Sequence, residues 1–171
     1  MFYKACLLLK RTVKFHKVYN IYLINNNMDL HIMDLLRASE YEPVKPTYAI
    51  RIHCSTSPDP EFVLKKSQFY RKISEYSFDD NEPLFQAGPV TITEDIADSI
   101  VRDFAKHKDN VEALLVHCTR GRNRSPAVAI ALNEVFSLGD NSNELKKEFH
   151  AYNKHVYKLV FEAGQRYHFM V

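Results

Sequence analysis

Val116-His117-Cys118-Thr119-Arg120-Gly121-Arg122-Asn123-Arg124-Ser125-Pro126 is a polar segment between two apolar runs. The run before it, residues 111–116, is short and rich in valine and leucine, which is typical of a buried strand. The run after it, residues 126–132, consists of alanine and aliphatic residues and predicts a buried helix. Ser125 is expected to be the N-cap of this helix and Pro126 its first residue, a position that favours proline. The sequence therefore predicts a strand, a tight loop and a helix in succession.

This loop has the features of an anion-binding site. The amides of a tight loop and the N-terminus of a helix can both point at one bound anion. Gly121 can adopt torsion angles that are closed to other residues, and Arg124 offers a planar fork for two oxygen atoms. The backbone amides expected to surround a tetrahedral oxyanion are those of Thr119, Arg120, Gly121, Arg122, Asn123 and Arg124.

Cys118 is the candidate nucleophile of this loop. It follows the predicted strand and faces the N-terminus of the predicted helix, with Arg124 nearby. These surroundings favour the thiolate over the thiol at neutral pH, and the thiolate is the nucleophilic form. Ser125 can donate a hydrogen bond to the sulfur when the sulfur acts as a leaving group.

The elements expected around the loop alternate between strands and helices. The strands are predicted at 18–24, 47–54, 73–78 and 111–116, and the helices at 28–38, 61–70, 91–106, 126 to about 139, 141–152 and from 153 onward. Thr91 and Glu94 form a predicted capping box, Asn141 and Asn153 are predicted to begin helices, and Gly139 is predicted to end one. This order predicts an α/β fold with a central, mostly parallel sheet flanked by helices. Ligands bind such sheets at the carboxyl ends of the strands, where Cys118 lies.

Composition limits the class of protein. The chain has 171 residues and a net charge of only +2, so we expect one domain over 17–171, preceded by a basic extension at 1–16. The net charge favours no stable nucleic-acid partner, and no apolar run approaches the length that spans a membrane. The three widely spaced cysteines form neither a disulfide framework nor a zinc pattern, so a cytoplasmic protein is expected. The oligomeric state is left open.

The sequence His117-Cys118-(five residues)-Arg124-Ser125 resembles the signature of the cysteine-dependent protein tyrosine and dual-specificity phosphatases. The likeness includes the preceding histidine, the glycine three residues after the cysteine, and the flanking strand and helix. It implies a small, atypical member with a dual-specificity-phosphatase-like fold and a phosphorylated protein or other phosphomonoester as substrate. In this family the histidine supports the loop through hydrogen bonds, which is the role expected for His117.

The same resemblance implies a general acid on a loop upstream of the preceding long helix. Asp79 and Asp80 lie there, and Asp80 is the predicted acid, with Asp79 as the alternative. Cys118 would attack phosphorus to form a phosphocysteine, and Asp80 would protonate the leaving oxygen and then activate water. No metal and no cofactor is implied.

Four points stay open, namely the role of Arg120 and Arg122, a likeness to RNA 5′-triphosphatases, a function without catalysis, and the role of Cys54. Arg120 and Arg122 either face solvent or select a highly anionic substrate, such as a phosphoinositide or an RNA 5′ end. The loop also resembles that of RNA 5′-triphosphatases, although these typically lack the aspartate. A third possible function, beside a protein phosphatase and a phosphatase of RNA or phosphoinositides, is a phosphate-binding module without catalytic activity. In some family members a cysteine placed like Cys54 forms a protective disulfide with the nucleophile, or Cys54 is a buried, inert residue.

Overall fold

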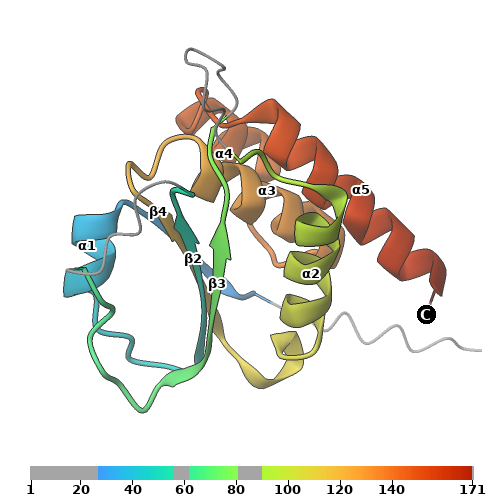
Figure 1. Ribbon diagram of the computed structural model, residues 1–171. Helices are drawn as coiled ribbons and strands as arrows, with labels where there is room; N and C mark the ends of the chain where they lie inside the picture. Colours follow the sequence, from blue (N-terminus) through green and yellow to red (C-terminus); the bar gives the residue numbers. More distant parts are fainter. Residues whose placement is uncertain (1–26, 56–61, 81–89, 171) are drawn as a thin grey trace, which may run out of the picture.

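The centre of the fold is a four-stranded parallel sheet with the strand order β1-β4-β2-β3 (Figure 1). The computed structural model describes residues 27–55, 62–80 and 90–170. The strands are β1 (Asp29–Met33), β2 (Thr47–His53), β3 (Tyr70–Ser77) and β4 (Ala113–Cys118). The helices are α1 (Leu35–Glu40), α2 (Glu94–Ala105), α3 (Arg124–Phe136), α4 (Ser142–Glu148) and α5 (Lys154–Met170), with a short 3₁₀ turn at Lys108–Asn110. The predicted α/β class is therefore confirmed.

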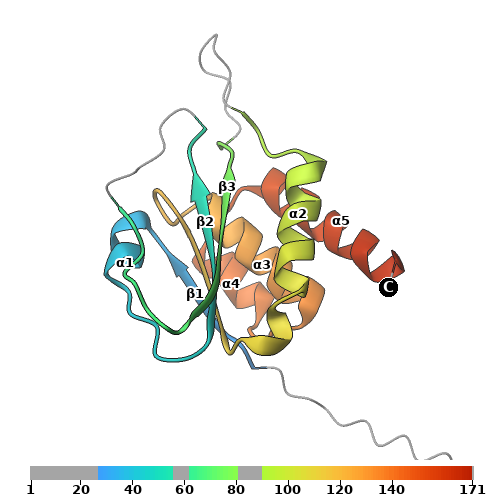
Figure 2. The same cartoon turned by 60° about the horizontal axis from the view of Figure 1, so that its bottom comes forward.

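Helices cover the two faces of the sheet unequally. Helix α1 lies on one face, whereas α2, α3 and α5 lie on the other, as the two views agree (Figures 1 and 2). The larger hydrophobic core is on the second face, where Ile50, Val116 and Cys118 from the sheet pack with residues of α2, α3 and α5. The smaller core, on the first face, contains Leu115 and Ala38 of α1. Every residue of β4 is buried, because this strand lies between β1 and β2 under helices on both sides.

The helix predicted at 28–38 is wrong in its first half. Residues 29–33 form β1, which pairs in parallel with β4, and Asp34 then caps the short helix α1 by accepting a hydrogen bond from the amide of Arg37. Leu30 and Ile32 contact the larger core, while Met33 contacts the smaller one. This alternation is that of a strand, and the pairing with β4 decides it against the helical spacing of the same apolar residues.

Several predicted helix boundaries are corrected. The N-cap of α2 is Thr93 rather than Thr91, and its hydroxyl oxygen accepts from the amide of Ile96. Helix α3 begins at Arg124 with Asn123 as N-cap, so Ser125 is its second residue and not its cap. The C-cap of this helix is Ser137, which has φ 52°, and not Gly139, which follows two residues later with φ 117°.

The remaining expectations have mixed outcomes. Asn141 and Asn153 cap α4 and α5 as predicted, each accepting two backbone amides on its side-chain oxygen. Residues 62–67 are irregular, so the helix predicted at 61–70 is wrong over this part. The strand predicted at 18–24 lies outside the described residues. Among the helices of the described part, none has the length and apolarity needed to cross a membrane.

Candidate active site

The loop between β4 and α3 lies at the carboxyl edge of the sheet and packs against the junction of β1 and α1. Gly121 has φ 66°, a left-handed conformation that suits glycine. A Cβ atom at Gly121 would lie 2.6 Å from the backbone nitrogen of Asp34 and 2.8 Å from the carbonyl carbon of Met33. The amide of Leu35 also donates to the carbonyl of Thr119 at 3.4 Å. A glycine is therefore required at position 121 both by its conformation and by this close approach.

Cys118 ends β4 and is 2% exposed. Its Sγ atom lies 3.2 Å from the hydroxyl oxygen of Ser125, in the first turn of α3. The unpaired amides at the start of a helix give this end a partial positive charge. The sulfur thus lies within hydrogen-bonding distance of a hydroxyl and next to the positive end of α3.

The guanidinium of Arg124 is buried and connects three segments of the chain. Its Nη1 atom donates to the carbonyls of His53 at 3.1 Å and Phe78 at 2.7 Å. Its Nη2 atom lies 3.4 Å from both the hydroxyl oxygen of Thr119 and the Sγ of Cys54. Burial alone would lower the pKa of Arg124, but the neighbouring thiols, that of Cys118 above all, together with Asp80, raise it above its ordinary value. Arg124 is therefore a fixed positive charge inside the site.

The two neighbouring aspartates have different surroundings. The carboxylate of Asp80 lies 3.5 Å from Nε of Arg124, a contact that has the distance of an ion pair but is not a hydrogen bond. Asp79 points elsewhere, because its carboxylate accepts hydrogen bonds from the amide and the hydroxyl of Ser55. The backbone amide of Asp79 also donates to the carbonyl of Val90 at 2.8 Å. Asp80 therefore lies at the loop, whereas Asp79 joins Ser55, which follows β2, to Val90, which precedes α2.

Asn153 joins the loop to Asp80, and sequence reasoning predicted it only as a helix cap. Its Nδ2 atom donates to Asp80 at 3.2 Å, while its Oδ1 accepts the first amides of α5. Its backbone amide donates to the carbonyl of Asn123 at 3.1 Å, and the Asn123 side chain donates to the carbonyl of Ala151 at 2.8 Å. The cap signal was readable in the sequence, whereas a contact between residues 73 positions apart was not.

His117 is buried beneath the loop, with 1% exposure. Neither ring nitrogen has a hydrogen-bond partner among the described residues, so the hydrogen bonds expected from the family resemblance are not present there. Burial, together with the nearby charge of Arg51, lowers the pKa of His117 to about 4. His117 is therefore a neutral, buried side chain, and its role as a support of the loop stays a prediction.

Acidification is expected to destabilise the fold through His117. An unfolded histidine has a pKa of about 6.5, so at pH values between about 6.5 and the folded value the unfolded chain binds a proton that the folded chain does not. Above pH 6.5 the neutral His117 costs the fold nothing, and as the pH falls below this value the free energy of unfolding decreases. At 1.36 kcal/mol per pKa unit, the decrease is about 2 kcal/mol at pH 5. Urea unfolding at pH 7.5 and pH 5 measures this decrease in the free energy of unfolding. The His117→Gln variant should lose correspondingly less stability than the parent chain, and an equal loss in both would contradict the assignment.

Cys54 lies directly beside the loop. Its Sγ atom is 3.6 Å from the hydroxyl oxygen of Thr119 and contacts Arg124. Ile52, two residues earlier in the chain, pairs with Cys118 across β2 and β4. Both cysteines are free thiols, and the disulfide between them stays a prediction.

Arg120 and Arg122 project from the outside of the loop and are exposed. Neither forms an ion pair with a residue in the described ranges, so their charge is not neutralised there. Within 27–55, 62–80 and 90–170, no group of three or more His, Cys, Asp or Glu side chains is placed to hold a metal ion.

No protein-family model matches the chain, and no curated protein matches it in sequence. Solved structures do match. Tk-PTP in its active form is 14% identical, with a TM-score of 0.47 over 80% of this chain and 90% of that one. The human tyrosine phosphatase-like serine/threonine/tyrosine-interacting protein is 17% identical, with a TM-score of 0.37 over 72% of this chain and 77% of that one.

A third match is OH1 from the Orf virus, a tyrosine phosphatase with triple substrate specificity. It is 13% identical, with a TM-score of 0.36 over 81% of each chain. Identities of 13–17% are too low to carry an activity from these proteins to this chain.

Proposed function

We propose that this chain hydrolyses phosphomonoesters through a phosphocysteine intermediate, as a protein tyrosine or dual-specificity phosphatase. One observation carries the proposal: a thiol, a buried guanidinium and a carboxylate meet at the N-terminus of α3. Cys118 and Arg124, at the two ends of the loop between β4 and α3, supply the thiol and the guanidinium, and Asp80, which follows β3, supplies the carboxylate. A phosphorylated protein is the expected partner. The widely spaced cysteines fit a reducing compartment, so we place the protein in the cytoplasm.

In the first step the phosphate group of the substrate occupies the loop. The amides of residues 119–124, the guanidinium of Arg124 and the start of α3 offset its negative charge. The Cys118 thiolate attacks phosphorus, an S–P bond forms, and the P–O bond to the leaving group breaks. Asp80 gives its proton to the departing oxygen, which leaves as a neutral alcohol or phenol.

In the second step a water molecule attacks the phosphocysteine. Asp80, now a carboxylate, takes a proton from this water, and the S–P bond breaks as the new P–O bond forms. The departing Cys118 thiolate receives a hydrogen bond from the hydroxyl of Ser125, which lies 3.2 Å from the sulfur. Asn153 holds the carboxylate of Asp80 near the loop throughout. Every group in this cycle comes from the chain, the substrate or water.

The Asp80→Asn variant is expected to lower kcat for an alkyl or tyrosine phosphate about 100-fold, the lower end of the usual range for general acid catalysis. The loss should be smaller for an ester whose leaving group needs no proton, such as p-nitrophenyl phosphate at neutral pH. An amide cannot transfer the proton, although it preserves the shape of the side chain.

The matched control is Asp79→Asn, which removes the charge one position earlier in the chain. It is expected to weaken the contacts with Ser55 and to lower the melting temperature while kcat stays closer to the parent value. Steady-state kinetics with both esters tests the pair. A large kcat loss in Asp79→Asn, with none in Asp80→Asn, would reverse the assignment of the acid.

Arg120 and Arg122 are exposed and form no ion pair with a described residue, which favours a second candidate on the same chemistry, namely a phosphoinositide or an RNA 5′-phosphate substrate. A panel of phosphotyrosine and phosphoserine peptides, phosphoinositides and RNA 5′-triphosphate separates the candidates by kcat/KM. Binding of a phosphopeptide to the parent chain without turnover of any of these compounds would replace the enzyme by a phosphate-binding module.

A further inference from the structure

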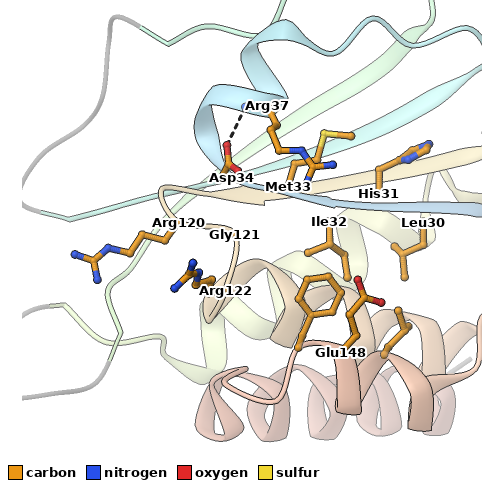
Figure 3. A pocket seen from close by; sticks show the side chains of 12 residues that line it. Leu30, His31, Ile32, Met33, Asp34, Arg37, Arg120, Gly121, Arg122 and Glu148 are labelled. Carbon is orange, nitrogen blue, oxygen red and sulfur yellow. Dashed lines mark hydrogen bonds between the residues drawn. The ribbon is translucent and has the colours of Figure 1, made fainter.

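A cavity of about 410 Å³ lies on the outer side of the loop, between the β1–α1 junction and α4 (Figure 3). A second cavity of about 340 Å³ adjoins it and shares Gly121, Arg122, Glu148 and Phe149 with it. We call the two together the edge groove. Each volume falls within the range of about 300–1,000 Å³ that is usual for binding sites. The groove starts at the loop itself, so a substrate held by its phosphate group would be close to it.

The edge groove extends around β1, the outermost strand of the described sheet, and has a different character on each side of this strand. Leu30 and Ile32 point across the cavity toward the helix that carries Glu148 (Figure 3). On the other side of β1, the Arg37 side chain extends over Met33 (Figure 3). One side is therefore apolar and the other carries a cation.

The positive charges of two arginines in the edge groove can interact with a ligand. Neither Arg37 nor Arg122 forms an ion pair with a residue of the described part of the chain. The carboxylate of Asp34 is engaged as the cap of α1. Glu148 is exposed on α4 and, of the described residues that line the groove, is the one acidic side chain on the apolar side.

From these contacts we infer that the edge groove binds the chain segment next to the phosphorylated residue of a protein substrate. This inference rests on the proposed function and specifies its substrate class: an extended phosphopeptide with an acidic residue and a large apolar residue on alternate positions. Successive side chains of an extended peptide point to opposite sides, which matches the two sides of β1. The acidic residue lies toward Arg37, and the apolar residue lies on Leu30 and Ile32.

The apolar side argues for a peptide rather than for a nucleic acid. The apolar side of the groove is lined by Leu30, Ile32, Leu145 and Phe149. Burial of an apolar side chain of the ligand against these residues makes binding more favourable. A nucleic acid would bring a phosphate charge at every residue, and Glu148 would repel it on this side. A peptide with one acidic side chain avoids this repulsion.

The test uses the full chain with Cys118→Ser, so that bound phosphopeptides are not hydrolysed. Two fluorescent phosphotyrosine peptides of equal length are titrated, one with glutamate and leucine on alternate flanking positions and one with glutamine and serine. Arg37→Gln is expected to weaken binding of the acidic peptide about threefold to fivefold, the size of one exposed ion pair, and to leave the other peptide unchanged. Glu148→Gln is expected to strengthen binding of the acidic peptide.

Lys147→Gln is the matched control, because it removes an exposed positive charge on α4 that does not line the groove. Equal losses in Lys147→Gln and Arg37→Gln, or equal binding of the two peptides by the parent, would overturn the inference. Tighter binding of a 5′-phosphorylated RNA oligonucleotide, with that binding lost in Arg37→Gln, would assign the groove to nucleic acid. Turnover of p-nitrophenyl phosphate by the chain with Cys118 intact is measured separately. Its absence would refute the proposed function, whereas selective peptide binding without turnover would still support the groove.

Discussion

Replacing Cys118 with serine is expected to abolish hydrolysis of p-nitrophenyl phosphate and phosphotyrosine while the fold is retained. The substitution exchanges one atom in a buried position that already contacts the hydroxyl of Ser125, so packing changes little. A serine hydroxyl is far less acidic than a thiol and stays protonated at neutral pH, so no comparable nucleophile forms. Loss of an enzyme's nucleophile costs about 10³-fold or more in kcat.

Steady-state kinetics and thermal unfolding of the same preparation measure the two effects together. Cys54→Ser is the matched control, since it makes the same exchange at the other thiol near Arg124. It should retain turnover, because Cys54 lies beside the guanidinium and not at the start of α3. Robust hydrolysis by Cys118→Ser would remove the phosphocysteine mechanism altogether.

Arg124→Lys is expected to lower kcat/KM about 100- to 1,000-fold, as when a preorganised donor to a developing oxyanion is lost. The guanidinium has enough donors to hold the carbonyls of His53 and Phe78 and still face a phosphate group, because its fork is planar and fixed. An ammonium group cannot keep this geometry. It would leave at least one of these carbonyls without its partner, which costs about 1–3 kcal/mol for a buried group.

The melting temperature of Arg124→Lys should therefore fall together with its activity. Arg122→Lys provides the comparison on the same loop. Its side chain is exposed and forms no ion pair with another residue of the described ranges, so the exchange should cost far less activity and no stability. Similar activity losses in the two variants would show that the loop needs positive charge in general and not the fork of Arg124.

The local parts of the fold could be predicted from the sequence. Strands β2 and β4, the loop after β4 and the caps Asn141 and Asn153 all depend on neighbouring residues, and each was expected close to where it lies. Strand β1 was missed because its apolar residues fit helical and strand spacing alike. Its pairing with β4, which places Met33 beside His117, is a tertiary interaction that the segment itself does not encode.

The candidate site divides in the same way. Cys118 and Arg124 were found because the loop sequence contains both of them. Asp80 was predicted over Asp79 from the family resemblance, and the different partners of the two adjacent carboxylates became visible only in the coordinates. Cys54 contacts Thr119, which is 65 positions away in the sequence, and Asn153 contacts Asp80, which is 73 positions away. A local sequence pattern cannot predict contacts between residues so far apart.

The link between Asn153 and Asp80 also fixes when the site can be completed during protein synthesis. A chain emerging from the ribosome presents β1 to β4 and the loop before it presents α5. Asp80 has no amide partner, and Asn123 lacks its contact with the start of α5, until residue 153 has been added. At about 5–20 residues per second, synthesis of the residues between the start of α3 and residue 153 takes only seconds. Residue 153 is nevertheless added after every other part of the site. The arrangement thus makes the final geometry of the loop depend on α5, which follows every other part of the site in the chain.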